Sequence, residues 1–207
     1  MSSPQGRTIG RPKKSSQDMP MQQKILWVAT NEFMAHGYKA VSMDGIAAAG
    51  NVTKATIYYY YDSKAALFTE TVVHLMSRVK THTERMLADE SYPFKERLIN
   101  MLEAYANATA SMDVNNFIRE AMPSLSEAQK RAVHESEKFM HQAIIESFDR
   151  EMKRGTIPTK NIDFVLHTFL ALMNVGRYTD YDEKRLFPDT RQGAEDIVNF
   201  FWAGLFA

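Results

Sequence analysis

Apolar residues repeat with helical spacing along almost the whole chain, and no stretch alternates convincingly with the period of two that a strand requires. Capping residues, glycines and prolines divide this pattern into about nine helices with short connections. The sequence therefore predicts an all-α fold. The 207 residues include no cysteine, which excludes a disulfide framework, a thiolate metal site and a cysteine nucleophile.

Three short helices are predicted within residues 21–61. The first ends at Gly37, because glycine readily takes the left-handed conformation that terminates a helix. Gly50-Asn51 forms a tight turn between the second and third helices, since both residue types tolerate a positive φ. Two short helices across such a turn are typical of a helix-turn-helix, whose second helix enters the major groove of DNA with its N-terminus first.

The third helix of this set carries side chains that suit a phosphate backbone. Lysine neutralises phosphate, and hydroxyl groups hydrogen-bond to its oxygens. The candidate DNA contacts of this region are Ser42, Thr53, Lys54, Thr56, Tyr58, Tyr59, Tyr60 and Lys64. A tyrosine run on a short helix is by itself more often core or interface than DNA contact, so the interpretation depends on the turn and on the capping residues around it.

The basic residues are concentrated at the N-terminal end. Residues 1–64 contain 8 Lys/Arg and 4 Asp/Glu, whereas residues 65–207 contain 17 and 21, and the formal net charge is zero. This asymmetry favours a polyanionic partner for the N-terminal part. Residues 1–18 lack periodicity and are predicted to form a disordered basic arm. Arg11 and Lys13 could enter an adjacent minor groove, or the arm could be a solvated tail that adds only nonspecific attraction.

The sequence resembles the TetR family of bacterial regulators across residues 29–68. The matching positions are Ala29, Phe33, Gly37-Tyr38, Val41-Ser42-Met43, Ile46-Ala47, residues 52–61, Ser63-Lys64 and Leu67-Phe68. The resemblance implies a three-helix helix-turn-helix DNA-binding domain over residues 19–64. It also implies a helical ligand-binding and dimerisation domain over residues 65–207. The chain departs from the usual pattern at Asn51, where glycine is common, and at Tyr61, where phenylalanine is common.

The resemblance also implies roles for individual residues. Thr53 would cap the recognition helix and contact phosphate, and Lys54 and Thr56 would face base edges or the DNA backbone. The tyrosines at 58–60 would pack against the sugar-phosphate wall or bind phosphate. Lys64 would reach a phosphate from the start of the fourth helix.

Methionine and aromatic residues are frequent in the middle helices and suit an adaptable apolar cavity. The family binds an inducer in a cavity between these helices, which shifts the spacing of the two DNA heads. The candidate pocket residues are Met86, Met101, Tyr105, Phe117, Met122 and Phe139. Each of them, taken alone, is more often core than ligand contact.

Two helices are predicted to form a dimer interface. Residues 162–175 are apolar almost all round, so this helix must be buried on several sides. The resemblance implies that it packs with the last helix against their copies around a two-fold axis. The candidate interface residues are Phe164, Phe169, Met173, Ile197, Phe201 and Trp202. Such a dimer would place its recognition helices about 34–36 Å apart, or a multiple of a turn, on a near-palindrome.

The sequence favours no enzymatic function. It has no glycine-rich phosphate loop and no nucleophile elbow. His134, Glu137 and His141 could share a helix face at a spacing that can hold a metal, but a solvated face is the commoner outcome. Glu103 and Glu120 are lone carboxylates that could bind a cationic ligand or face water. We therefore expect neither a cofactor nor a metal.

The function expected from these features is that of a DNA-binding homodimer, usually a repressor, released from double-stranded operator DNA by a small, largely apolar effector. The alternative is a helical ligand- or partner-binding module whose helix-turn-helix is only a scaffold. The basic arm and the exposed polar residues of the third helix favour the first. The first twenty residues lack the apolar core of a signal peptide, and no segment is apolar enough to span a membrane. A cytoplasmic, nucleoid-associated protein is expected.

Overall fold

A computed structural model describes residues 19–109, 114–179, 181–182 and 184–207. This part of the chain forms nine α-helices and no strand, which confirms the predicted all-α fold. Arg11 and Lys13 lie outside the described residues, so their contact with a minor groove stays a prediction. The α-helices are α1 (Met21–Ala40), α2 (Met43–Ala49), α3 (Lys54–Tyr60), α4 (Lys64–Leu87), α5 (Phe94–Ala108), α6 (Val114–Ala121), α7 (Glu127–Lys153), α8 (Ile162–Val175) and α9 (Thr190–Phe206), with a short 3-10 helix, η2 (Met122–Ser124), between α6 and α7.

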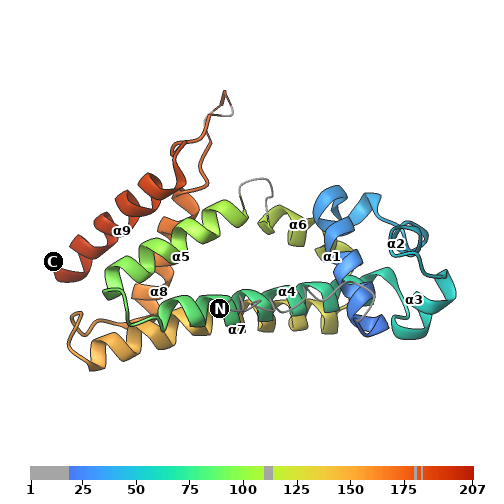
Figure 1. The fold of residues 1–207 in the computed structure, drawn as a ribbon, viewed down its shortest axis with the longest axis horizontal. Helices are drawn as coiled ribbons and strands as arrows, with labels where there is room; N and C mark the ends of the chain where they lie inside the picture. The colour runs from blue at the N-terminus through green and yellow to red at the C-terminus, as the bar shows by residue number, and fades with distance from the viewer. Residues whose placement is uncertain (1–18, 110–113, 180, 183) are drawn as a thin grey trace, which may run out of the picture.

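Helices α4 and α7 are the longest and run alongside each other as the spine of the molecule (Figure 1). Helices α1, α2 and α3 lie at one end of this spine and are called the head below. Helices α5, α8 and α9 lie at the other end and are called the body. Helix α6 packs against α1 and therefore lies on the head side of the body helices.

Helices α2, α3 and α4 begin at capping side chains, as the sequence predicts. The Ser42 hydroxyl accepts the Gly45 amide at 3.0 Å, and Thr53 and Ser63 cap α3 and α4 in the same way at 3.1 Å. Each cap satisfies an amide that the helix leaves unpaired and stabilises it by about 1 kcal/mol. Asn51 has a φ of 48°, which confirms the predicted turn between α2 and α3.

A cluster of aromatic rings joins the head to α4 and α6. Phe68 of α4 lies 5.2 Å from Phe33 and 5.0 Å from Tyr38, both of α1, and 5.0 Å from Phe117 of α6, measured between ring centroids. The buried core of the head therefore continues past residue 64 into α4 and α6. The predicted domain boundary at residue 64 stays a prediction, and it falls within this continuous core.

A second core fills the body and is built around Phe148 of α7. Its ring lies 5.4 Å from Phe94 of α5, 5.6 Å from Phe169 of α8 and 5.6 Å from Phe201 of α9. These rings belong to four different helices, so the burial of their apolar area holds α5, α7, α8 and α9 together.

A buried ion pair ties three helices together beside this core. Arg97 of α5 and Glu151 of α7 are 5% and 2% exposed, and their Nη2 and Oε1 atoms are 3.0 Å apart. The Nη1 atom of Arg97 donates to the Leu87 carbonyl at the end of α4, at 2.6 Å. Because both charges are withdrawn from water, each depends on the other for compensation.

Glu151→Ala should lower the free energy of unfolding by about 3–5 kcal/mol, since it leaves the Arg97 guanidinium buried without its counter-ion. Urea denaturation at matched protein concentration measures the change. The double variant Arg97→Met/Glu151→Leu removes both charges and should recover most of the loss. A loss below about 1 kcal/mol for Glu151→Ala, as is typical of an exposed pair, would contradict this assignment.

Candidate DNA interface and effector cavity

Helix α3 presents most of the predicted DNA contacts to solvent. Ile57 and Tyr61 anchor it in the core of the head. On its outer side, the residues that are exposed are Thr53, Lys54, Tyr58, Tyr59 and Tyr60, while Ser42 is exposed at the start of α2 and Thr56 is half-buried. Tyr59 is 83% exposed, so its ring is accessible to a partner molecule. The DNA contacts of these residues stay predictions.

Lys54 is held in place by an acidic residue of the neighbouring helix. Its Nζ atom lies 2.9 Å from Oδ2 of Asp44 in α2, and the pair is exposed. The hydrogen bond to Asp44 raises the pKa of Lys54, so this lysine is fully protonated at neutral pH. The pair orients the cation beside the N-terminus of α3, where a phosphate would also meet unpaired amides.

Lys64 makes contacts within the chain that the sequence does not predict. Its Nζ atom donates to the carbonyl oxygens of Tyr38 and Val41 at 2.8 Å each and of Lys39 at 3.4 Å. It also lies 4.4 Å from the centre of the Tyr38 ring. The three donors of the ammonium therefore point to the end of α1, and Lys64 connects α1 to the start of α4. The predicted contact of Lys64 with phosphate stays a prediction.

Residues 37–41 form a turn at the end of α1. Its carbonyl oxygens bind Lys64, and its amides bind a carboxylate. Glu120 of α6 accepts the amides of Tyr38 and Lys39 at 3.2 Å each. Gly37 permits this approach, because its φ is 77° and a Cβ atom there would lie 2.8 Å from Oε2 of Glu120. The predicted break at Gly37 is confirmed as a kink, after which α1 continues for one more turn to Ala40.

Glu120 and Glu103 therefore both have partners within the chain. Glu103 of α5 lies 3.2 Å from Arg191 of α9, which also pairs with Glu96 and Glu195. Neither carboxylate faces the large cavity described next.

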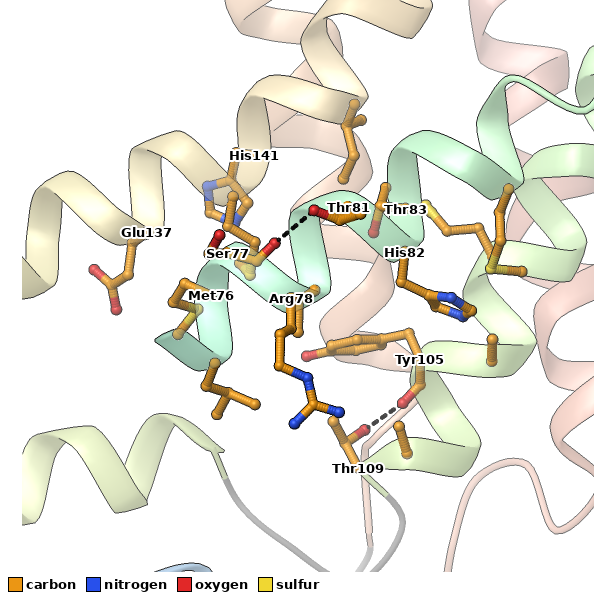
Figure 2. A pocket seen from close by; sticks show the side chains of 18 of the residues that line it. Met76, Ser77, Arg78, Thr81, His82, Thr83, Tyr105, Thr109, Glu137 and His141 are labelled. Carbon is orange, nitrogen blue, oxygen red and sulfur yellow. Dashed lines mark hydrogen bonds between the residues drawn. The ribbon is translucent and has the colours of Figure 1, made fainter. Parts of the chain in front are cut away.

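A cavity of about 980 Å³ lies between the head and the body. Helix α4 contributes the largest share of its lining, and α5, α7 and α8 contribute further residues. Figure 2 shows side chains of α4, α5 and α7 around it. Helix α1 lines it with Trp27, Thr30, Asn31 and Met34, and α6 lines it with Ile118. A ligand in this cavity would touch both the head and the body.

Three of the six predicted pocket residues line this cavity, namely Met86, Met101 and Tyr105. The other three do not. Phe117 packs in the core of the head, and Met122 packs against the same core. Phe139 projects from α7 toward solvent beneath the Lys80 ammonium, which lies 4.5 Å from the centre of its ring. The residue types alone could not predict which of the six residues line the cavity, because lining depends on which side of each helix faces the cavity.

The contribution of α1 to the cavity is absent from the sequence-based predictions. Trp27 lies on the side of α1 opposite the buried stripe that marks the helix as amphipathic, and it is 52% exposed. An apolar residue on the polar side of an amphipathic helix was the available signal.

Glu137 and His141 both line the cavity. His134 lies beside Glu137, with its Nδ1 atom 3.3 Å from Oε2 of that carboxylate. Burial lowers the pKa of His141, so its ring is neutral at pH 7. No group of three or more acidic or histidine side chains is arranged to hold a metal among the described residues.

The predicted dimer residues divide into inner and outer positions. Phe169, Met173, Ile197 and Phe201 are buried within the subunit, so their assignment to an interface is corrected. A helix that is apolar all round must bury one side in its own subunit, and these residues occupy that side. Phe164 is 71% exposed, and Trp202 is half-buried against Phe94 and Phe206. The outward apolar residues of α8 and α9 include Val175, Phe200 and Phe206.

Within the described part of the chain, no helix combines the length and the apolarity that crossing a membrane requires.

The head matches a known protein family. Residues 25–71 match the family described as bacterial regulatory proteins of the tetR family, a segment that runs from α1 into α4. The chain is 38% identical over 80 residues to an uncharacterized HTH-type transcriptional regulator, YhgD of Bacillus subtilis, a match that covers 39% of this chain and 41% of YhgD. The chain therefore spans about two fifths of the length of YhgD.

Two further proteins resemble more of the chain. The negative transcriptional regulator IcaR of the biofilm operon icaADBC of Staphylococcus epidermidis is 24% identical over 135 residues, or 62% of this chain and 70% of IcaR. The crystal structure of the transcriptional regulator FadR of Bacillus subtilis in complex with stearoyl-CoA superposes with a TM-score of 0.70 at 15% identity. That superposition covers 88% of this chain and 98% of FadR, and it shows a shared fold.

The family match and the shared fold cover different extents of the molecule. The matched segment contains the helix-turn-helix, and the shared fold extends through the body to α9. The matched family is described as regulatory proteins, and YhgD and IcaR are named as transcriptional regulators. Residues 25–71 are similar to the tetR family of bacterial regulatory proteins, and the described chain as a whole shares its fold with FadR.

Proposed function

We propose that the protein is a transcription regulator that binds double-stranded operator DNA as a homodimer through α2 and α3. A small molecule in the cavity would control this binding. The observation that carries the proposal is the juxtaposition of an exposed, capped recognition helix with a cavity that α1 of the same head helps to line. The cavity gives an effector direct contact with the element that carries α2 and α3.

The DNA-binding part of the proposal rests on the outer side of α3. Thr53 and Lys54 would meet phosphate at the helix N-terminus, and the tyrosines at 58–60 would pack along the sugar-phosphate wall. Few of these side chains suit base edges, so we infer that specificity comes from a small number of groove contacts together with the spacing of two half-sites.

The effector would act through the 37–41 turn. Ile118 of α6 lines the cavity, and Glu120, two residues further along the same helix, holds the turn. A ligand that binds better when α6 is displaced would shift the population toward a state in which the turn is released. The two heads would then no longer fit successive grooves of the operator.

We further propose that the protein is a repressor that acts on DNA in the cytoplasm, associated with the nucleoid. The relative IcaR is a negative regulator, which favours repression. The fold neighbour FadR binds stearoyl-CoA, which favours a small-molecule effector with apolar character. A gel shift with DNA from upstream of the protein's own gene tests the proposal. The alternative of a helix-turn-helix without DNA function predicts that no specific, salt-dependent complex forms.

The dimer is proposed to form through the outer sides of α8 and α9. Phe164 of α8 and Phe200 of α9 are 71% and 73% exposed, and Val175 and Phe206 extend this apolar surface. Large apolar side chains gathered on adjacent helices are typical of an interface. A two-fold axis through this surface would leave both heads free at the far ends of the molecule.

Lys54→Ala should weaken operator binding and reduce the slope of log K against log salt by about one unit, because one phosphate contact is lost. Binding titrations at several salt concentrations measure the slope. The matched control is Lys160→Ala, which removes an exposed lysine from the loop before α8 and should leave the slope unchanged. If the Lys54→Ala slope equals that of the unmodified protein, Lys54 does not contact a phosphate.

Phe200→Asp should convert the dimer into a monomer, because it places a charge in the apolar interface on both subunits. Sedimentation velocity measures the oligomeric state. Tyr92→Asp makes a similar change at an exposed aromatic residue before α5 and should leave the dimer intact. A stable dimer for Phe200→Asp would place the interface elsewhere.

A further inference from the structure

The lining of the cavity changes character from its inner end to its mouth. The inner residues are apolar and buried, and they come from five helices: Met76, Met101, Ile118, Ile144 and Met173. The residues of α4 that line the mouth are exposed and polar: Ser77, Arg78, Thr81, His82 and Arg85. A cavity of this kind suits a molecule with an apolar part and one polar end.

The charged groups of the cavity are two guanidinium groups and one carboxylate. Arg85 is engaged locally, because its Nη2 atom lies 2.7 Å from Nδ1 of His82. Glu137 lies on α7 beside His134, at 3.3 Å. Arg78 differs from both, since it makes no hydrogen bond or ion pair with any residue in the described part of the chain.

The position of Arg78 directs its charge toward the space between α4 and α5. Figure 2 shows its side chain extending from α4 on the side where α5 carries Tyr105 and Thr109, and away from the α7 helix that carries Glu137 and His141. The carboxylate of Glu137 therefore does not compensate this guanidinium. His141 adds no positive charge near neutral pH, because burial lowers its pKa.

We propose that the effector is an amphipathic carboxylate, with its carboxylate paired to Arg78 and its apolar body among the inner methionines and isoleucines. This inference rests on the proposed role of the cavity as the effector site. A guanidinium can bind a carboxylate with two parallel hydrogen bonds, which gives direction as well as affinity. The flexible methionine side chains accommodate alkyl chains of varied shape.

Dodecanoate is the probe for this proposal, compared with 1-dodecanol as its neutral analogue and dodecyltrimethylammonium as its cationic one, all below their micelle-forming concentrations. Trp27 lines the cavity and is one of only two tryptophans in the chain, so intrinsic fluorescence reports binding. Dodecanoate should change the fluorescence at lower concentration than either analogue. The change should vanish in Trp27→Phe, which identifies the reporter.

Arg78→Gln should weaken dodecanoate binding by about tenfold to a hundredfold, the range expected for loss of a charge-assisted hydrogen bond. Its affinity for 1-dodecanol should change by less than about twofold, since the apolar contacts are intact. The matched control, Arg85→Gln, removes the guanidinium that is already engaged by His82 and should weaken dodecanoate binding by less than about threefold. Arg78 is exposed and has no side-chain partner among the described residues, so the thermal midpoint of Arg78→Gln should equal that of the unmodified protein.

Three results would overturn the proposal. These are unchanged dodecanoate affinity in Arg78→Gln, tighter binding of the cationic than of the anionic amphiphile, and no binding of dodecanoate at all. The fluorescence assay uses the free protein, so it is independent of DNA. Failure of dodecanoate to bind, together with a specific operator complex in the gel shift, refutes the carboxylate effector alone. Binding of dodecanoate without any operator complex refutes the DNA-binding function alone.

Discussion

The orientation of the head depends on how the backbone of the 37–41 turn is satisfied. The kink at Gly37 leaves amides and carbonyls without helical partners. Two side chains of opposite charge supply those partners: Glu120 of α6 accepts the amides of Tyr38 and Lys39, and Lys64 of α4 donates to the carbonyls of the same turn. Lys64 belongs to α4, which continues into the body, and Glu120 belongs to α6, which lines the cavity at Ile118. The head is therefore tied to both helices by hydrogen bonds as well as by apolar packing.

This arrangement explains why an effector could act at a distance from DNA. The cavity reaches α6 at Ile118 and α1 at Trp27, on either side of the turn. A small displacement of α6 would move the Glu120 carboxylate, and the amides that it accepts would lose a charge-assisted partner. Because α2 and α3 follow the turn directly, their angle to the spine would change with it. Glycine is required at position 37 for two reasons. Its φ is positive, and the Glu120 carboxylate approaches too closely for a Cβ atom.

Features that depend on residues close together in the sequence could be predicted from the sequence. The caps at Ser42, Thr53 and Ser63 and the turn at Asn51 follow from local hydrogen bonding and backbone preference, and all four are confirmed. The nine helices follow from periodicity, and the head follows from a family pattern whose positions are closely spaced.

Features that depend on which side of a helix meets which neighbour could not be predicted. Phe169 and Phe201 are as apolar as Phe164 and Phe200, yet the first two fill the subunit core and the last two face outward. Lys64 was predicted to bind phosphate because its position in the sequence is close behind α3. Its ammonium bends back to α1 because the turn there offers three carbonyls, and only the tertiary structure brings them within reach.

The central claim is that Glu120 fixes the angle between the head and the body. The chain has no cysteine, so spin labels can be placed uniquely with Ala49→Cys at the end of α2 and Lys160→Cys before α8. Pulsed electron resonance on the doubly labelled chain, diluted with an excess of unlabelled chain, measures the distance within one subunit. The account predicts a single narrow distance distribution that broadens when Glu120→Ala is added. An equally narrow distribution at the same distance in the Glu120→Ala chain would contradict it.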